Sequence, residues 1–411
     1  MTERRWSIRA RSAVAVRAPG RLAFMCTVAI CGLLAGETSA RQEPPGPQPV
    51  SAEQLKAAID RLGDLDYSVR TNASRTIRRT SGAQAVPALL GAVADHVDGY
   101  VRYRALVLLT GFGDPRTRDA MRESLSSPND RLRTVAYGFF EHNPDPAMIP
   151  ELLAALERET AEFVRPALVR AMAALGDEAR VRQALVRETG RGQDFFRSAA
   201  IEALGDHRAR YAYDALAAVA KLDGPLLDDA AVALGKIGDT RALETLAILQ
   251  RSAPRTAQPY VAAAICLLGV NCESHEHYIV ETLKFADQNI GFQALLRAAA
   301  SSLGTLGVAG RASAAEALFE VGIPSRDPTR SPIALALATI ALRNTRLLLS
   351  GLERRARGAE AIALLGEGFD MLEEDFDKER FFALVRRTYW ESPQGSPTRD
   401  LMQTLIGKLD F

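Results

Sequence analysis

Cysteine, histidine and aromatic side chains are scarce in this chain of 411 residues. It holds four cysteines and five histidines, and aromatic residues make up 6% of it although hydrophobic residues make up 47%. The apolar content is therefore mostly alanine and leucine, which favours closely packed helices over β-sandwiches. The shortage leaves little material for nucleophilic catalysis, and no Ser-His-Asp order, phosphate-binding loop or Cys-His pair stands out in the sequence.

The chain also lacks an excess of charge of either sign. Lys and Arg number 51 and Asp and Glu number 50, which gives a net charge of +1. A groove that follows nucleic acid needs a basic excess, so the sequence predicts no nucleic-acid partner. The length exceeds what one compact core usually serves, and either several domains or an elongated array is expected.

The first 40 residues have the order of a secretory signal peptide. Residues 1–21 are rich in arginine, "LAFMCTVAICGLLAG" is apolar, and "ETSA" ends in small residues, which predicts cleavage after Ala40. The apolar run of about 15 residues is shorter than the ~20 that a spanning helix needs. We therefore expect export to the periplasm or the medium, no stable membrane span in the mature chain, and a flexible leader over residues 41–51. The pair Arg4-Arg5 leaves a twin-arginine signal open.

From residue 52 the sequence repeats a helical pattern about every 30–35 residues. Copies include "DYSVRTNASRTI" from Asp66, "DGYVRYRALVLL" from Asp98 and "DFFRSAAIEALGD" from Asp194. Alanine at every third or fourth position gives each helix a face that another helix can approach closely. Pairs such as Gly113-Asp114 and Gly205-Asp206 are expected to end one helix in the left-handed conformation and cap the next. Because no helix pair can bury its own face, the pattern predicts an all-α solenoid of stacked antiparallel helix pairs.

The repeat resembles the HEAT family. The stretches "RSAAIEALGD", "DDAAVALGKIGD" and "RAAASSLGTLG" look most like the HEAT-like repeat that is also found in phycobilin lyases. The resemblance covers residues 52–322 and implies an α-solenoid in which the second helix of each pair lines the concave side. It implies no particular chemistry, since most such arrays hold proteins together. We expect residues 323–411 to form degenerate helical repeats and a C-terminal cap with a polar outer face.

Arginine recurs once per repeat, and the aligned positions are Arg70, Arg102, Arg133, Arg165 and Arg197. In two copies it follows an aspartate by four residues, so that one helical turn lets the pair meet. The resemblance implies an inter-repeat polar ladder at this position, and the role is interpreted as structural. Partner contacts are expected instead at non-ladder polar and aromatic positions of the second helices: Arg75, Arg78, Arg79, Tyr103, Arg104, Tyr137 and Arg170.

The stretch "CESHEHY", from Cys272 to Tyr278, collects one cysteine and two histidines. We expect it in a loop between helices, with the next helix beginning near Tyr278. One hypothesis is a metal site formed by Cys272, His275 and His277, with Cys266 as a fourth ligand, since tetrahedral zinc accepts that set. The opposing interpretation is a polar loop. Cys266 and Cys272 are the cysteines left after signal removal, so in an oxidising compartment either a disulfide or two separate thiols is expected.

The sequence predicts a non-catalytic scaffold or adaptor in the cell envelope, without a cofactor, that binds a protein or peptide through its concave surface. An accessory or inhibitory subunit of an envelope enzyme fits the same features. Deoxyhypusine hydroxylase is a HEAT-like di-iron enzyme with several His-Glu pairs, whereas this chain has only His275-Glu276. The alternative hypothesis, from another class, is an envelope protein that binds a metal or small ligand at residues 272–277.

Overall fold

The computed structural model describes residues 50–222, 224–355 and 358–411, which fall within one compact unit of residues 44–411. The predicted signal peptide and the leader up to residue 49 lie outside the described residues, and that prediction stays a prediction. The described residues contain 22 α-helices, four short 3₁₀ helices and no β-strand. The predicted all-α class is confirmed for this part of the chain.

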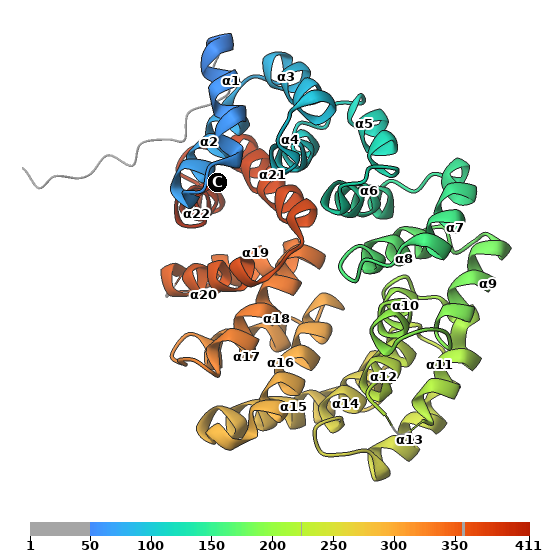
Figure 1. The fold of residues 1–411 in the computed structure, drawn as a ribbon. Coiled ribbons are helices and arrows are strands. Elements are labelled where there is room, and N and C mark those ends of the chain that lie inside the picture. Colours follow the sequence, from blue (N-terminus) through green and yellow to red (C-terminus); the bar gives the residue numbers. More distant parts are fainter. Residues whose placement is uncertain (1–49, 223, 356–357) are drawn as a thin grey trace, which may run out of the picture. The chain divides into compact units, whose positions relative to one another are not determined.

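The helices alternate between two layers (Figure 1), and we call the layer of even-numbered helices up to α20 the inner layer. Its members are α2 (Tyr67–Arg79), α4 (Gly99–Thr110), α6 (Asp130–His142), α8 (Arg165–Ala173), α10 (Asp194–Asp206), α12 (Leu227–Lys236), α14 (Gln258–Leu267), α16 (Gln293–Val308), α18 (Arg330–Arg343) and α20 (Gly358–Met371). Each contacts the next even-numbered helix, from α2 to α20. This unbroken succession is what a solenoid requires, because each repeat buries its apolar face on its neighbours.

The odd-numbered helices up to α19 form the outer layer. They are α1 (Ala52–Asp60), α3 (Gly82–Asp95), α5 (Thr117–Ser124), α7 (Ile149–Arg158), α9 (Ala179–Glu188), α11 (Tyr213–Ala220), α13 (Ala242–Ser252), α15 (Cys272–Gln288), α17 (Ala312–Gly322) and α19 (Thr345–Glu353). The 3₁₀ helices η1 (Arg61–Gly63), η2 (Pro146–Met148), η3 (Arg210–Ala212) and η4 (Ile290–Phe292) precede α2, α7, α11 and α16. Two further helices, α21 (Asp375–Glu391) and α22 (Pro397–Lys408), complete the described chain.

The aspartates and glycines that separate the repeats lie at helix ends, although this does not hold for every Gly-Asp pair. Asp66 accepts hydrogen bonds from the backbone N–H groups of Ser68 and Val69, which caps α2, and Asp98 caps α4 in the same way. Gly113 has a φ of 64°, which is the left-handed conformation that the sequence predicts. The prediction is wrong for Gly205, which lies inside α10. A Cβ at Gly205 would stand 2.9 Å from Cα of Ala233, so this glycine permits close packing of α10 on α12.

The helix α18 is buried on more than one side, as its apolar sequence predicts. Ile333, Leu337 and Ile340 are fully buried, and the helix contacts both α16 and α20. Within the described ranges no single helix has the length and apolar character of a membrane span. The pair α18 and α19 meets those criteria only when taken together, and it is bent by 116°.

The helix α21 contacts the first repeats as well as the last ones. It packs on α4, α6, α18 and α22 (Figure 1). Phe376 joins the apolar core of the first half of the array, whereas Phe381, Val385 and Tyr389 join the core of the second half. The prediction of a simple C-terminal cap therefore needs correction, because the charged face of α21 is turned toward the N-terminal repeats rather than toward solvent.

Candidate functional site

We call the contact of α21 with α2, α4 and α6 the seam, and ion pairs dominate it. Arg78 on α2 binds Glu379 on α21 with two hydrogen bonds to one oxygen, Nη2–Oε2 at 2.6 Å and Nε–Oε2 at 3.0 Å. The two side chains are 6% and 1% exposed. Arg386 donates from Nη2 to the other oxygen of Glu379 at 3.2 Å. One buried carboxylate thus joins two arginines, and the pairing leaves none of these three charges isolated.

A second carboxylate of α21 reaches α4. Asp375 accepts hydrogen bonds from the hydroxyl of Tyr103 and from Nη1 of Arg104, the latter at 3.1 Å. Burial lowers the pKa of Arg104, and the nearby Arg78 lowers it further. The arginines of α2 and α4 are therefore crowded together, and the acidic start of α21 supplies the compensating charge.

The third group of ion pairs centres on Glu141 of α6. This carboxylate lies 3.1 Å from Nε of Arg170, 3.5 Å from Nε2 of His207 and 3.5 Å from Nη1 of Arg343. Those partners come from α8, the end of α10 and the end of α18. Residues that are far apart in the sequence therefore converge on one carboxylate.

Asp377 of α21 lies next to this group. It pairs with Nε2 of His142 at 3.0 Å, with Arg380 at 3.0 Å and with Arg343 at 3.7 Å. Arg343 is shared between Glu141 and Asp377, so the two carboxylates belong to one connected network. This network holds α21 against both α6 and α18.

The cations around Glu141, Asp377 and Glu379 favour the ionised form of these three carboxyl groups. Burial by itself raises the pKa of Glu141, but His207, Arg170 and Arg343 lower it to about 2. The pKa values of Asp377 and Glu379 are also lowered, against the effect of burial, by their hydrogen bonds and cationic neighbours. A lowered pKa stabilises the fold fully above the unfolded value of 4.5, and this contribution is lost as the pH falls toward 2. These three carboxylates are therefore ionised throughout the neutral range.

A polar pocket of about 400 Å³ lies at the seam between α2 and α4 on one side and α20, α21 and α22 on the other. Its cationic lining residues are Arg70, Arg78, Arg104, Lys378 and Lys408, and its acidic ones are Asp370, Asp375, Glu379 and Asp410. Phe411 stacks on Phe382 with ring centroids 4.1 Å apart at its wall. Opposite charges in near balance make the pocket a place where two parts of the chain meet, without the uncompensated charge that would attract a small ion.

The repeating arginines bind backbone carbonyls at the end of the preceding segment. Arg70 donates to the carbonyl oxygens of Asp64 and Leu65, at 2.7 and 2.9 Å. Arg102 donates to Val93 and Arg197 to Thr189, each through Nε. Helix ends leave such carbonyls without partners, and a guanidinium satisfies them.

Arg133 and Arg165 add an ion pair with a glutamate of the next helix pair, whereas Arg197 pairs with Asp194 of its own helix at 2.9 Å. Arg133 bonds the carbonyl of Ser127 and the carboxylate of Glu159, and Arg165 bonds the carbonyl of Glu159 and the carboxylate of Glu188. The predicted hydrogen-bonded pair of Asp66 and Arg70 does not form. Asp66 caps α2 instead, and Arg70 binds the backbone carbonyl of Asp64. The position is occupied by contacts within the repeat array, which is the structural role that the sequence predicts.

The residues predicted to contact a partner lie on α2, α4, α6 and α8, the inner-layer helices that also carry the ladder arginines. Tyr103 and Tyr137 are buried. Arg75, Arg78, Arg104 and Arg170 pair with Asp410, Glu379, Asp375 and Glu141, and Arg79 is half-buried. The prediction of free contact residues is therefore wrong for most of this set, because α21 and the C-terminal Asp410 bind four of them and Glu141 of α6 binds Arg170.

Sequence reasoning missed the carboxylates that bind these arginines. Glu141 follows the aromatic pair "FF" near the end of its helix, and Asp375, Asp377 and Glu379 alternate in "DFDKE". The sequence offered one signal for this pairing: the first repeats are rich in arginine, whereas the C-terminal part is acidic and aromatic. Charge pattern alone gives no pairing, because it carries no information on which segments meet.

The prediction that "CESHEHY" is a loop is wrong, because α15 begins at Cys272. Asn271 precedes it with a φ of 43°, so the chain turns in the left-handed conformation and enters the helix at once. On a helix His275 and His277 lie about 200° apart and cannot face one ligand. Among the described residues no group of three His, Cys, Asp or Glu side chains is placed to hold a metal ion.

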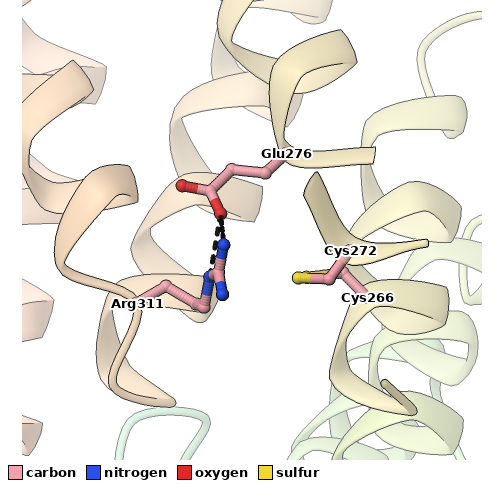
Figure 2. Close-up of a disulfide and its surroundings, with 4 residues drawn as sticks. All are labelled: Cys266, Cys272, Glu276 and Arg311. Atoms are coloured by element: carbon pink, nitrogen blue, oxygen red, sulfur yellow. Dashed lines mark hydrogen bonds and ion pairs between the residues drawn. A yellow bond between two sulfur atoms is a disulfide. The ribbon is translucent and has the colours of Figure 1, made fainter. Parts of the chain in front are cut away.

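The same stretch makes two structural contacts instead (Figure 2). Cys272 is paired with Cys266 of α14 as a disulfide, and Glu276 binds Arg311 ahead of α17, with Nη2–Oε2 at 2.7 Å. Glu276 is buried. The two contacts hold the start of α15 against α14 and the turn before α17.

The disulfide gives a testable prediction. Reduction, or the substitution Cys272→Ser, should lower the unfolding free energy by about 2 kcal/mol, because the bridge closes a short loop in the unfolded chain. Thermal unfolding with and without reductant measures this, and the doubly substituted chain, Cys266→Ser with Cys272→Ser, should not respond to reductant. Non-reducing peptide mapping that finds two free thiols in protein from an oxidising compartment contradicts the bridge.

The inner layer beyond the seam carries polar side chains that reach solvent. Glu202 and Asp206 of α10 are exposed, and Asp229 of α12 is partly exposed. Ser198 donates to Asp229 at 2.6 Å, and Lys236 pairs with Asp206 at 2.6 Å. Although Glu202 reaches solvent, surrounding protein desolvates its carboxyl group, and with the repulsion of Asp229 this raises its pKa to about 7. Lys236 and Arg170 lower this pKa without offsetting the rise, so the wall formed by α10 and α12 has a carboxyl group with a raised pKa.

Stacked helix pairs in two layers, with no strand between residues 50 and 411 where the chain is described, define the molecule as an α-solenoid. Residues 55–139 match the HEAT repeats family, and residues 227–250 match the PBS lyase HEAT-like repeat. These two parts of the chain are thus similar to HEAT-type repeats. The predicted resemblance to this repeat is confirmed.

Comparison with solved structures finds helical proteins of low identity. The protein YibA of Escherichia coli matches with a TM-score of 0.39 and 17% identity, over 54% of this chain and 83% of that one. The complex of CpcE and CpcF of phycocyanin lyase from Nostoc sp. PCC7120 matches with a TM-score of 0.25 and 20% identity, over 80% and 96%. Importin beta matches with a TM-score of 0.38 and 13% identity, over 86% and 61%. No curated protein matches the sequence. Identities this low carry no function to this chain.

Proposed function

We propose that this α-solenoid is a non-catalytic scaffold or adaptor that binds a protein or peptide partner through the inner layer. The observation that carries the proposal is the contrast along that layer. The seam covers α4 and α6 with α21, whereas α10 and α12 present Glu202, Asp206 and Asp229 to solvent. We also propose that the chain is exported, on the signal-like residues 1–40, so that its partner lies in the cell envelope or outside the cell.

The raised pKa of Glu202 supports a contact at α10 and α12. Desolvation of this carboxyl group costs folding free energy that Lys236 and Arg170 do not fully offset, and a partner that supplies a hydrogen-bond donor offsets more of that cost. The ladder arginines and the seam residues are already paired within the chain, so they leave this wall as the better contact surface. The proposed contact surface is therefore formed by α10 and α12, and the arginines of α2, α4, α6 and α8 are not part of it.

Cross-linking affinity capture from the native envelope and culture fluid tests the proposal. The chain should recover one stoichiometric protein partner, with cross-links on α10 and α12. The variant Glu202→Lys should lose the partner while keeping its helical content, because Asp206 and Asp229 tolerate a cation beside them. The matched control is Glu281→Lys on the exposed face of α15, which should capture as the unaltered chain does. Recovery of the chain alone, or full capture by Glu202→Lys, contradicts the proposed surface.

A further inference from the structure

A groove of about 590 Å³ runs between α1 and α3, the first two helices of the outer layer. Leu55 and Ile59 of α1 face Ala88, Gly91 and Ala92 of α3 across it. The floor is therefore apolar and built largely of small side chains. Asp60, Asp95 and His96 stand at one end of the groove.

The groove floor resembles helix faces elsewhere in the chain that are built of glycine and alanine. Those faces are covered by a neighbouring helix. A Cβ at Gly235 of α12 would lie 2.6 Å from Cα of Ala264, and one at Gly304 of α16 would lie 3.2 Å from Cβ of Ala336. Both glycines allow the next inner helix to pack closely. Gly91 has no such neighbour within 4 Å, so its surface is open to a helix that no described part of the chain provides.

Two fully exposed apolar side chains continue the groove past its acidic end. Val97 is 99% exposed and Leu65 is 98% exposed, and both directly precede an aspartate that caps an inner helix. Their turns are adjacent, because a Cβ at Gly63 would stand 2.6 Å from Oδ2 of Asp98. Apolar side chains left entirely in water next to an apolar groove are typical of an interaction surface.

The charge around this surface is negative on balance. Its carboxylates are Glu53, Asp60, Asp64, Asp66, Asp95 and Asp98, and its cations are Lys56, Arg61, Arg70 and Arg102. Arg70 and Arg102 are counted because their guanidinium groups bind the backbone carbonyls of Asp64, Leu65 and Val93. Lys56 is already paired with Asp60 at 2.9 Å, and His96 lies 3.2 Å from the same carboxylate. Asp95 is exposed beside the groove and makes no ion pair with the described residues. The excess of negative charge selects a positively charged occupant.

We infer that this surface, formed by the α1–α3 groove with Val97 and Leu65, docks a basic amphipathic helix of another protein. The apolar side of that helix fills the groove over Gly91 and covers the exposed turns. Its lysine or arginine residues face Asp95, Asp98 and Asp66. The surface belongs to the outer layer, so it is separate from the inner-layer contact proposed above, and either can fail without the other.

Fluorescence anisotropy with two designed peptides tests the inference on the purified chain. The first probe is a labelled amphipathic helix of leucine and lysine, and the second is its leucine and glutamate counterpart. Saturable binding of the first and none of the second is expected. The substitutions Gly91→Phe, which fills open space, and Asp95→Lys should each weaken the first peptide about tenfold. The matched controls Gly407→Phe on α22 and Glu123→Lys on α5 should leave its affinity unchanged.

Equal binding by all variants, or equal affinity for both peptides, overturns the inference. Sedimentation velocity on the same proteins tests whether a second copy of the chain occupies this surface instead. If the unaltered chain forms a dimer that Gly91→Phe dissociates, the surface is an interface between copies and the proposed partner helix is wrong. Unchanged circular dichroism of Gly91→Phe shows that loss of binding does not come from unfolding.

Discussion

Replacing Glu379 by alanine should lower the unfolding free energy by about 3–5 kcal/mol, the usual cost of removing one partner from a buried ion pair. The side chain is 1% exposed and is the shared partner of Arg78 and Arg386. Without it, two guanidinium groups remain at the seam with no carboxylate between them. Urea unfolding monitored by circular dichroism measures the loss of unfolding free energy. A pair of distance probes, one on α21 and one on α2, measures whether the two helices separate.

A double-mutant cycle shows whether the loss belongs to the pair. Arg78→Met should also destabilise the chain, and the cost of the double variant should be smaller than the sum of the single costs, because the two residues share one interaction. Glu281→Ala, which breaks the exposed pair with Lys284, should cost less than about 1 kcal/mol. Additive costs for Arg78 and Glu379 contradict the seam as an ion-paired closure.

Gly368→Ala should destabilise the array by about 3 kcal/mol or more through overpacking. Its Cβ would stand 2.2 Å from the carbonyl oxygen of Ala334 and 2.8 Å from Cβ of Ala338. A backbone atom of α18 cannot move aside as a flexible side chain does, so α18 and α20 must separate. The midpoint of thermal unfolding measures the effect.

The matched substitution for Gly368→Ala is Gly407→Ala on α22. Gly407 is also helical but has nothing within 4 Å of its Cβ position. Alanine there should stabilise the chain by about 0.5–1 kcal/mol, since it restricts the unfolded chain and favours helix. Equal effects of the two substitutions contradict the close approach of α18 and α20.

The repetition of the sequence was enough to predict the architecture. Aspartate caps such as Asp66 and Asp98 act over a few residues, and alanine spacing sets the face that each helix presents. Helix existence, helix order and the two-layer stack follow from such local rules. The role of the arginines could also be predicted, although Arg70 binds carbonyls of a preceding turn rather than Asp66.

Local rules failed where a contact depends on a distant segment. "CESHEHY" has polar, loop-like composition, yet Asn271 turns the chain so that Cys272 starts a helix and meets Cys266. Gly205 has the sequence context of a helix end, yet α12 packs on it within the helix. In each case packing against a neighbour outweighed the preference of the residues themselves.

By itself the sequence determined a HEAT-like solenoid, since its caps, alanine faces and repeat period act within one repeat and its neighbour. Only the tertiary structure decided that α21 lies on the first repeats and that Glu379 and Asp375 take the arginines once predicted to contact a partner. The physical reason is the range of the interactions: a repeat specifies its neighbour, whereas the meeting of residues some 300 positions apart depends on the small rotation between repeats, summed over the whole array.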